Sequence, residues 1–105
     1  MKIRFYNNDI QKFIKSLDKK TIARILRTLD LLEDFGYELK MPHSKYISEG
    51  IFELRIKSVQ HVRLFYVFYD IEVVIILHGF IKTGQKIPQK DWNTAVSRNK
   101  LIDKT

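Results

Sequence analysis

Apolar residues recur along this chain at two different spacings, and the spacing changes near its middle. In the first third they fall three or four positions apart, as on one face of an amphipathic helix. These residues are Ile10, Phe13, Ile14, Leu17, Ile22, Ile25, Leu26, Leu29 and Leu32. Asn7, Asn8 and Asp9 offer N-cap chemistry before the first run, and Asp18 offers it before the second. Gly36 suits the end of the second helix, because glycine accepts positive φ. The pattern predicts two helices joined in an α-hairpin.

Elsewhere apolar and polar residues alternate, which is the period of a strand with one buried face. Ile3 and Phe5 form a short run of this kind near the N-terminus. Three longer runs, rich in β-branched and aromatic residues, follow at Ile51–Lys57, Val62–Tyr69 and Glu72–Phe80. The connections between them are very short, so these runs predict a three-stranded antiparallel meander.

Two further segments complete the predicted order of elements. Residues 38–50, with Pro42, are expected to form a loop, and Pro88 can occupy the first turn of a last helix that runs through Trp92. The chain is then a single α+β domain, residues 1–105, with the order β-α-α-β-β-β-α. In this two-layer arrangement the helical hairpin covers one face of the sheet and leaves the other face partly open.

Composition indicates the class of protein. With 105 residues, no cysteine and 45% hydrophobic residues, the chain suits one globular domain without disulfides or thiolate-bound metals. Its N-terminus lacks the apolar run of a signal peptide. Its longest apolar run, Val73–Leu77, is far shorter than the ~20 residues that span a bilayer. We therefore expect a cytoplasmic protein that does not enter a membrane.

Charge points to an anionic partner. Nineteen Lys and Arg against twelve Asp and Glu give a net charge of +7, a surplus expected of a protein that meets phosphates or carboxylates. In the run FELRIK (52–57), the apolar side chains point to one face of the strand and Glu53, Arg55 and Lys57 to the other. Arg63 interrupts the apolar run of the next strand. A cation there needs a partner such as Glu53 or a ligand, and both can hold.

A third group of cations follows the last predicted strand. The segment HGFIKTGQKIP (78–88) places Lys82 and Lys86 in a turn just beyond Phe80, and Lys90 continues the charge. An exposed aromatic ring can stack on an RNA base while neighbouring cations hold phosphates. A lysine-rich turn can equally be a solvated turn, so this group is informative only together with the sheet cations.

Most enzyme classes lack their motifs here. The sequence has no phosphate-binding loop and no dinucleotide-binding fingerprint, and His43, His61 and His78 are not at metal-ligand spacing. We expect His61 to be structural, while His78 either hydrogen-bonds at the end of its strand or acts beside the lysine turn. Chemistry by cations remains: Arg and Lys can stabilise phosphoryl charge during RNA cleavage, and a lysine crowded by others can exchange a proton. Such chemistry requires no metal and no cofactor.

Three strings, in this order after a helical hairpin, resemble the RelE/ParE toxin superfamily and, more narrowly, its HigB-like, phage-derived branch. They are MPHSKYISEGIFELRIK (41–57), VRLFYVFYD (62–70) and HGFIKTGQKIP (78–88). The resemblance covers nearly the whole chain. It implies the toxin of a type II toxin–antitoxin pair. For RelE and HigB members it also implies an endoribonuclease that enters the ribosomal A site and cleaves mRNA there.

The resemblance implies roles for basic residues at three positions. Arg55 and Lys57 match the first position, Arg63 matches the second, and Lys82 and Lys86 match the third. Lys57 is then the candidate for proton transfer. Arg63 and Lys82 are candidates for stabilising phosphoryl charge.

Several residues are candidates for contact with RNA. They are Arg55, Phe80, His78, Lys90 and Trp92. Phe80 would stack a base, and Trp92 could stack but not act as an acid. Some RelE members carry a catalytic tyrosine near the C-terminus, whereas no tyrosine follows Tyr69 here. Other HigB proteins use a histidine near the end, whereas the last histidine here is His78, so the proton donor stays open.

The resemblance also implies partners. These are mRNA in the ribosomal A site and a cognate antitoxin, usually a helix-turn-helix, HigA-like protein in this branch. Two alternatives stay open. One is a ParE-like inhibitor of DNA gyrase, against which the basic set argues. The other is a non-catalytic nucleic-acid-binding or host-interaction protein of prophage origin, which would bind RNA with strong salt dependence and without cleavage.

Overall fold

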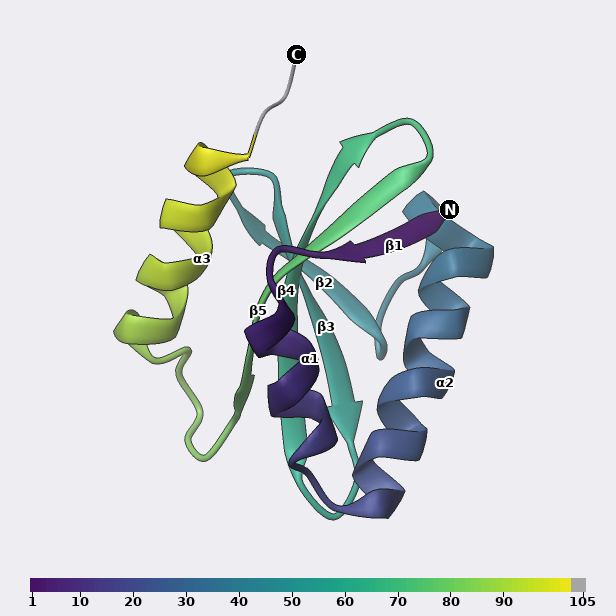
Figure 1. Cartoon of the computed structure of the whole chain (residues 1–105), viewed down its shortest axis with the longest axis vertical. Helices are drawn as coiled ribbons and strands as arrows, with labels where there is room; N and C mark the ends of the chain where they lie inside the picture. Colours follow the sequence, from purple (N-terminus) through teal and green to yellow (C-terminus); the bar gives the residue numbers. More distant parts are fainter. Residues whose placement is uncertain (103–105) are drawn as a thin grey trace.

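A computed structural model describes residues 1–102 and contains one five-stranded sheet with helices against both faces (Figure 1). In chain order the elements are β1 (Lys2–Phe5), α1 (Asn8–Lys15), α2 (Lys19–Phe35), the short 3-10 helix η1 (Gly36–Glu38), β2 (Ser44–Ser48), β3 (Ile51–Lys57), β4 (His61–Asp70), β5 (Val73–Ile81) and α3 (Gln89–Leu101). The predicted α+β class and the order of strands and helices are confirmed.

The helix boundaries follow from local chemistry. The Asn7 side chain accepts a hydrogen bond from the backbone N–H of Ile10 at 3.3 Å, which caps α1. The Asp18 carboxylate accepts from the N–H of Lys20 at 2.9 Å and caps α2. Gly36, at φ +50°, ends α2 in a conformation that costs other residues about 1–2 kcal/mol. The predicted caps are therefore confirmed.

The sheet has the strand order β1-β5-β4-β3-β2. β1 pairs with β5 in parallel, and the other neighbours are antiparallel. The expectation of a loop over residues 38–50 is wrong in part, because β2 lies inside this range and pairs with β3. A buried hydrogen bond between Ser44 Oγ of β2 and the Tyr66 hydroxyl of β4 also ties β2 to the sheet. β2 reads SKYIS, too short and polar to show an alternating pattern, so the strand forms because β3 offers it an edge.

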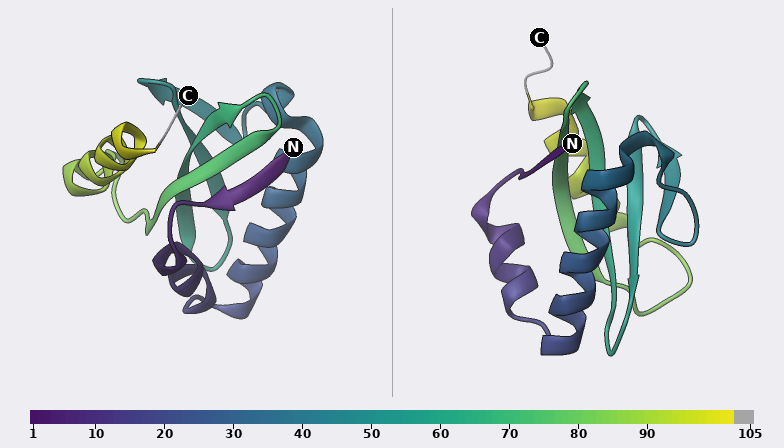
Figure 2. Two further views of the ribbon diagram at one scale, coloured as in Figure 1. Left: turned by 45° about the horizontal axis from the view of Figure 1, so that its top comes forward. Right: turned by 90° about the vertical axis from the view of Figure 1, so that its right-hand side faces the viewer.

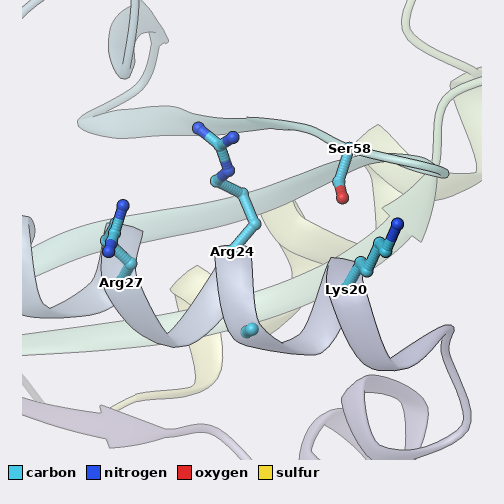
Figure 3. A pocket seen from close by; sticks show the side chains of 5 residues that line it. Lys20, Arg24, Arg27 and Ser58 are labelled. Atoms are coloured by element: carbon cyan, nitrogen blue, oxygen red, sulfur yellow. The ribbon is translucent and has the colours of Figure 1, made fainter.

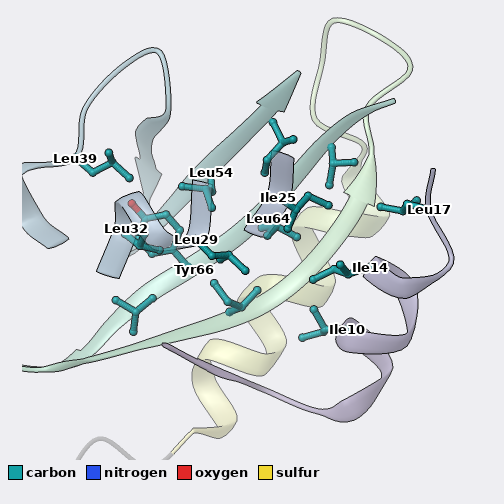
Figure 4. Close-up of a cluster of buried hydrophobic side chains, with 14 residues drawn as sticks. Ile10, Ile14, Leu17, Ile25, Leu29, Leu32, Leu39, Leu54, Leu64 and Tyr66 are labelled. Atoms are coloured by element: carbon teal, nitrogen blue, oxygen red, sulfur yellow. The ribbon is translucent and has the colours of Figure 1, made fainter. Parts of the chain in front are cut away.

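Two hydrophobic clusters hold the helices to the sheet. The larger one lies under α1 and α2 and contains Ile25, Leu32, Leu54 and Leu64 (Figure 4). The smaller one lies on the opposite face, where Ala95 of α3 packs among side chains of β3, β4 and β5. Figure 2 shows α3 across the sheet from the two N-terminal helices. Only Ala95 and Asn99 of α3 are buried, so this helix covers part of its face and leaves the rest open.

No helix among residues 1–102 is long and apolar enough to cross a membrane.

Close packing under α1 gives a stability test. A Cβ added at Gly79 of β5 would lie 2.8 Å from Leu64 Cδ2 and 3.0 Å from Phe13 Cε2. We expect Gly79→Ala to lower the free energy of unfolding by about 1–3 kcal/mol through overpacking. Gly84→Ala is the matched control, because nothing lies within 4 Å of a Cβ there. Its effect should stay within about 0.5 kcal/mol. Urea unfolding checks both, and equal stabilities of the two variants would contradict the packing described.

Candidate nucleic-acid interface

The antiparallel register places the predicted sheet cations in rows across three strands. Arg55 lies opposite Arg63, which lies opposite Phe80. Lys57 lies opposite His61, whose carbonyl oxygen accepts a hydrogen bond from the N–H of Lys82 at 2.8 Å. Residues directly opposite in an antiparallel pair point to the same face and lie about 5 Å apart. The cations thus gather at one end of the face that α3 covers only in part.

Arg55 and Arg63 form the inner row of cations, and Glu53 lies beside both of them. Its Oε1 lies 3.6 Å from Arg63 Nε and 3.8 Å from Arg55 Nε. Glu53 and Arg63 are each 3% exposed, whereas Arg55 is half-buried. Of the two alternatives left open for Arg63, a pairing with Glu53 or a ligand, the pairing is observed. Because its guanidinium is buried beneath the surface, Arg63 suits a positioning role better than direct contact with a phosphate.

Burial also changes the pKa of Arg63. Desolvation lowers the pKa of Arg63 below its ordinary value, the Glu53 carboxylate raises it, and the nearby Arg55 lowers it further. Arginine still stays protonated under all physiological conditions. The ion pairs leave hydrogen-bonding capacity unused, since Glu53 Oε2 and the Nε atoms of Arg55 and Arg63 are buried without a hydrogen-bond partner in the described part of the chain.

The outer row is open to solvent. Lys57 and His61 are exposed, and Lys82 is half-buried just beyond the end of β5. We call Lys57, His61 and Lys82 the sheet-end row. His61, which we expected to be structural, is exposed and lies between Lys57 and Lys82 in the sheet register. Sequence reasoning missed this row because Lys82, the neighbour of His61 on its other side, comes from the far end of β5.

The expectation of an exposed aromatic ring at Phe80 is wrong. Phe80 is 6% exposed and packs against Phe65, with ring centroids 5.3 Å apart. Its ring lies in the cluster beneath α3, because the strand period turns it to the same face as Phe65 and α3 then covers it. Trp92 is half-buried in the same cluster, edge-on to Phe65 at 5.4 Å. Neither ring lies free for a base.

His78 holds α3 to the sheet. Its Nε2 lies 2.6 Å from Oδ1 of Asp91, in the first turn of α3, and its ring stacks over Phe80. The hydrogen-bonding role considered for His78 therefore holds. Lys86 is exposed in the segment between β5 and α3, and Lys90 is exposed in the first turn of α3. The sheet register does not include these two lysines.

A second basic surface adjoins the first. Lys20, Arg24 and Arg27 of α2 line a groove together with Arg55 and Lys57 of β3. Figure 3 shows the part of this groove around Lys20, Arg24, Arg27 and Ser58. We call it the α2–β3 groove. Sequence reasoning missed it, since the helical period marks Lys20, Arg24 and Arg27 only as the polar face of α2. Their neighbours across the groove come from a strand some thirty residues later in the chain.

The chemical capacity of the interface lies in its cations and one imidazole. Protonated Lys57 and Lys82 can bind a phosphate, and a neutral imidazole can accept a proton. Within the described residues, no three His, Asp or Glu side chains come together as a metal site would require.

A family of known proteins matches most of the chain. The model of a family described as "Phage derived protein Gp49-like (DUF891)" matches residues 12–100. The matched range begins within α1 and ends in α3, so it includes β3, β4, β5 and the whole interface. No curated protein matches the chain.

Because Glu53 and Arg63 form a buried ion pair, we expect substitutions there to lower stability and a substitution of an exposed cation to leave it unchanged. We expect Glu53→Gln to lower the free energy of unfolding by about 3–5 kcal/mol, because it leaves the buried Arg63 without its carboxylate. Arg63→Met should cost less, because Glu53 keeps Arg55 as a partner. The double variant should lose less than the sum, since it removes both charges. Urea unfolding measures all three.

Lys57→Ala, on the same face but exposed, serves as the control and should change stability by less than about 0.5 kcal/mol. Additive effects in the double variant would show that Glu53 and Arg63 are not coupled.

Proposed function

Because this chain belongs to the Gp49-like family of phage-derived proteins, which is related to the RelE-like toxins, we propose that it is the toxin of a type II toxin–antitoxin pair. We propose further that it acts in the cytoplasm as a ribosome-dependent endoribonuclease that cleaves mRNA. A cognate antitoxin, of the helix-turn-helix type, would neutralise it.

One observation supports the nuclease more than any other. The register of β3, β4 and β5 brings Lys57, His61 and Lys82 together at an uncovered end of the sheet, although β-turns and whole strands separate them in the sequence. Two ammonium groups beside an imidazole can bind a phosphate and exchange protons around it. A surface serving solubility alone has no need of this convergence.

The reaction proposed is transesterification within the RNA strand. The 2′-oxygen attacks its adjacent phosphorus and loses its proton, while the bond from phosphorus to the 5′-oxygen breaks and that oxygen gains a proton. The products carry a 2′,3′-cyclic phosphate and a 5′-hydroxyl. No water, metal or redox partner is consumed.

Roles follow from the hydrogen-bonding groups of the side chains. His61 accepts the proton of the 2′-hydroxyl at an imidazole nitrogen. Lys57, as an ammonium group, gives a proton to the departing 5′-oxygen. Lys82 stabilises the charge that develops on the phosphoryl oxygens. Arg63 acts through Glu53, which fixes the orientation of Arg55 beside the row.

The function is tested by induced expression without antitoxin, followed by primer extension on abundant mRNAs. We expect growth arrest and breaks inside translated frames. In Lys57→Ala the breaks should fall about 10²- to 10⁴-fold, the usual effect of removing a general acid or base. Lys100→Ala, an exposed lysine of α3, is the matched control and should behave like the unchanged protein.

Arrest with intact transcripts and relaxed plasmid DNA would overturn the nuclease in favour of gyrase inhibition. The absence of both arrest and breaks, with folded protein present, would leave a binding protein.

The role of His61 is tested by single-turnover cleavage on purified programmed ribosomes. A general base contributes about 10²- to 10⁴-fold, so we expect the cleavage rate of His61→Ala to fall by that factor and to recover in part when free imidazole is added. Lys100→Ala, which lies on α3 and outside the row, is the control and should cleave at the unchanged rate. A His61→Ala variant that keeps the full rate would exclude His61 as the base.

A further inference from the structure

The α2–β3 groove consists of two adjoining hollows of about 360 and 190 Å³. Arg24 and Arg27 line both hollows. Lys20 extends the outer one towards Ser58, and Arg55 and Lys57 line the inner one. Figure 3 shows the side chains of Lys20, Arg24 and Arg27 in a line along α2, with Ser58 across from them. The groove is therefore a continuous cationic channel between a helix and the free end of β3.

The helix dipole does not account for the cations along α2. Its first turn contains Lys19 and Lys20, but the Asp18 carboxylate caps this end of the helix. The dipole acts only within the first and last turns, by about 0.3–1 kcal/mol for each charge, and Arg24 and Arg27 lie beyond the first turn. Helix stability therefore does not explain the positions of Arg24 and Arg27.

The groove cations are also free of acidic partners. Lys20, Arg24 and Arg27 are exposed, and no carboxylate of residues 1–102 lies within 4 Å of their charged groups. Like charges at this spacing on one helix repel one another. An arrangement of unpaired cations that repel one another is explained if an anion binds to it.

The lining indicates which kind of anion binds. The groove is lined by five cations, and the His43 imidazole is the one ring among its lining residues, so charge outweighs stacking surface. Peptide partners are ordinarily anchored by aromatic or large apolar side chains in a central pocket. The outer hollow has only Ala23 as apolar lining, whereas the inner hollow has Leu31, Pro42 and Ile56 beside its cations. A chain of phosphates needs only the cations, which line both hollows.

We propose that the α2–β3 groove binds the phosphodiester backbone of the mRNA strand beside the sheet-end row. This inference depends on the proposed nuclease function for its substrate. Arg55 and Lys57 belong both to the groove and to the sheet face, so a strand can pass from one to the other without a gap. Lys20 to Arg27 covers roughly 10 Å of helix, enough for more than one phosphate. Binding there would position the scissile phosphate irrespective of base sequence.

The groove is tested by salt titration of RNA binding. The probe is a fluorescein-labelled single-stranded RNA 12-mer with 2′-O-methyl groups, which keeps its phosphates and cannot be cleaved. The variant is Lys20→Gln/Arg24→Gln/Arg27→Gln. Each phosphate contact on a single strand contributes about 0.7 to the slope of log K against log salt, so the slope should fall by about 2. The affinity at low salt should fall with it.

The matched control is Lys2→Gln/Lys12→Gln/Lys100→Gln, which removes the same charge from exposed sites on β1, α1 and α3. We expect its slope to stay close to that of the unchanged protein. Equal slopes in the two triple variants would overturn the proposal, since net charge alone would then explain RNA binding. Circular dichroism ensures that both are folded.

Two further binding measurements would identify a different occupant of the α2–β3 groove. If the groove variant keeps its RNA slope but loses binding to an oligoglutamate peptide, the groove belongs to an acidic protein segment. If only binding to empty ribosomes is lost, it belongs to ribosomal RNA. Both results overturn the proposal. A lowered slope on the RNA probe without mRNA breaks in cells would support the groove and sink the nuclease.

Discussion

The antiparallel register of β3, β4 and β5 is the constraint on which the rest of this structure depends. Side chains alternate along a strand with a period of two, so a slip of one residue would turn every side chain to the other face. In the observed register, Leu54 and Leu64 lie under the helical hairpin while Arg55 and Arg63 lie together on the opposite face. The same pairing therefore forms the core and gathers the cations.

The Glu53 carboxylate offsets the electrostatic repulsion between Arg55 and Arg63. Without this carboxylate, two guanidinium groups would face one another across the sheet, one of them fully buried. The pairs are long and leave buried nitrogen and oxygen atoms without hydrogen bonds within residues 1–102. Buried charges of this kind contribute little net stability compared with apolar side chains of similar volume. Their retention in the middle of the sheet is consistent with a role in orienting the exposed cations beside them.

The two faces of the sheet have different roles: one forms the main core, and the other carries the exposed cations. α1 and α2 pack on one face and form the main core with it, whereas α3 is attached to the other face by the Phe65–Trp92 contact and the His78–Asp91 hydrogen bond. Because α3 stops short of the ends of β3 and β4, the sheet-end row is open to a large substrate. α2 takes part in both functions, since it packs on the core with one side and lines the basic groove with the other.

Local patterns in the sequence determined most of the fold. Helix caps at Asn7 and Asp18, the stop at Gly36 and the alternation in FELRIK each act through neighbours in the chain, so they can be recognised without coordinates. Tertiary structure decided the rest. The strand β2, the burial of Phe80 under α3, the position of His61 between Lys57 and Lys82, and the basic groove on α2 depend on which distant segments meet. Hydrophobic periodicity specifies the face on which a side chain lies, but only strand order and helix packing decide what stands opposite it and whether it is covered.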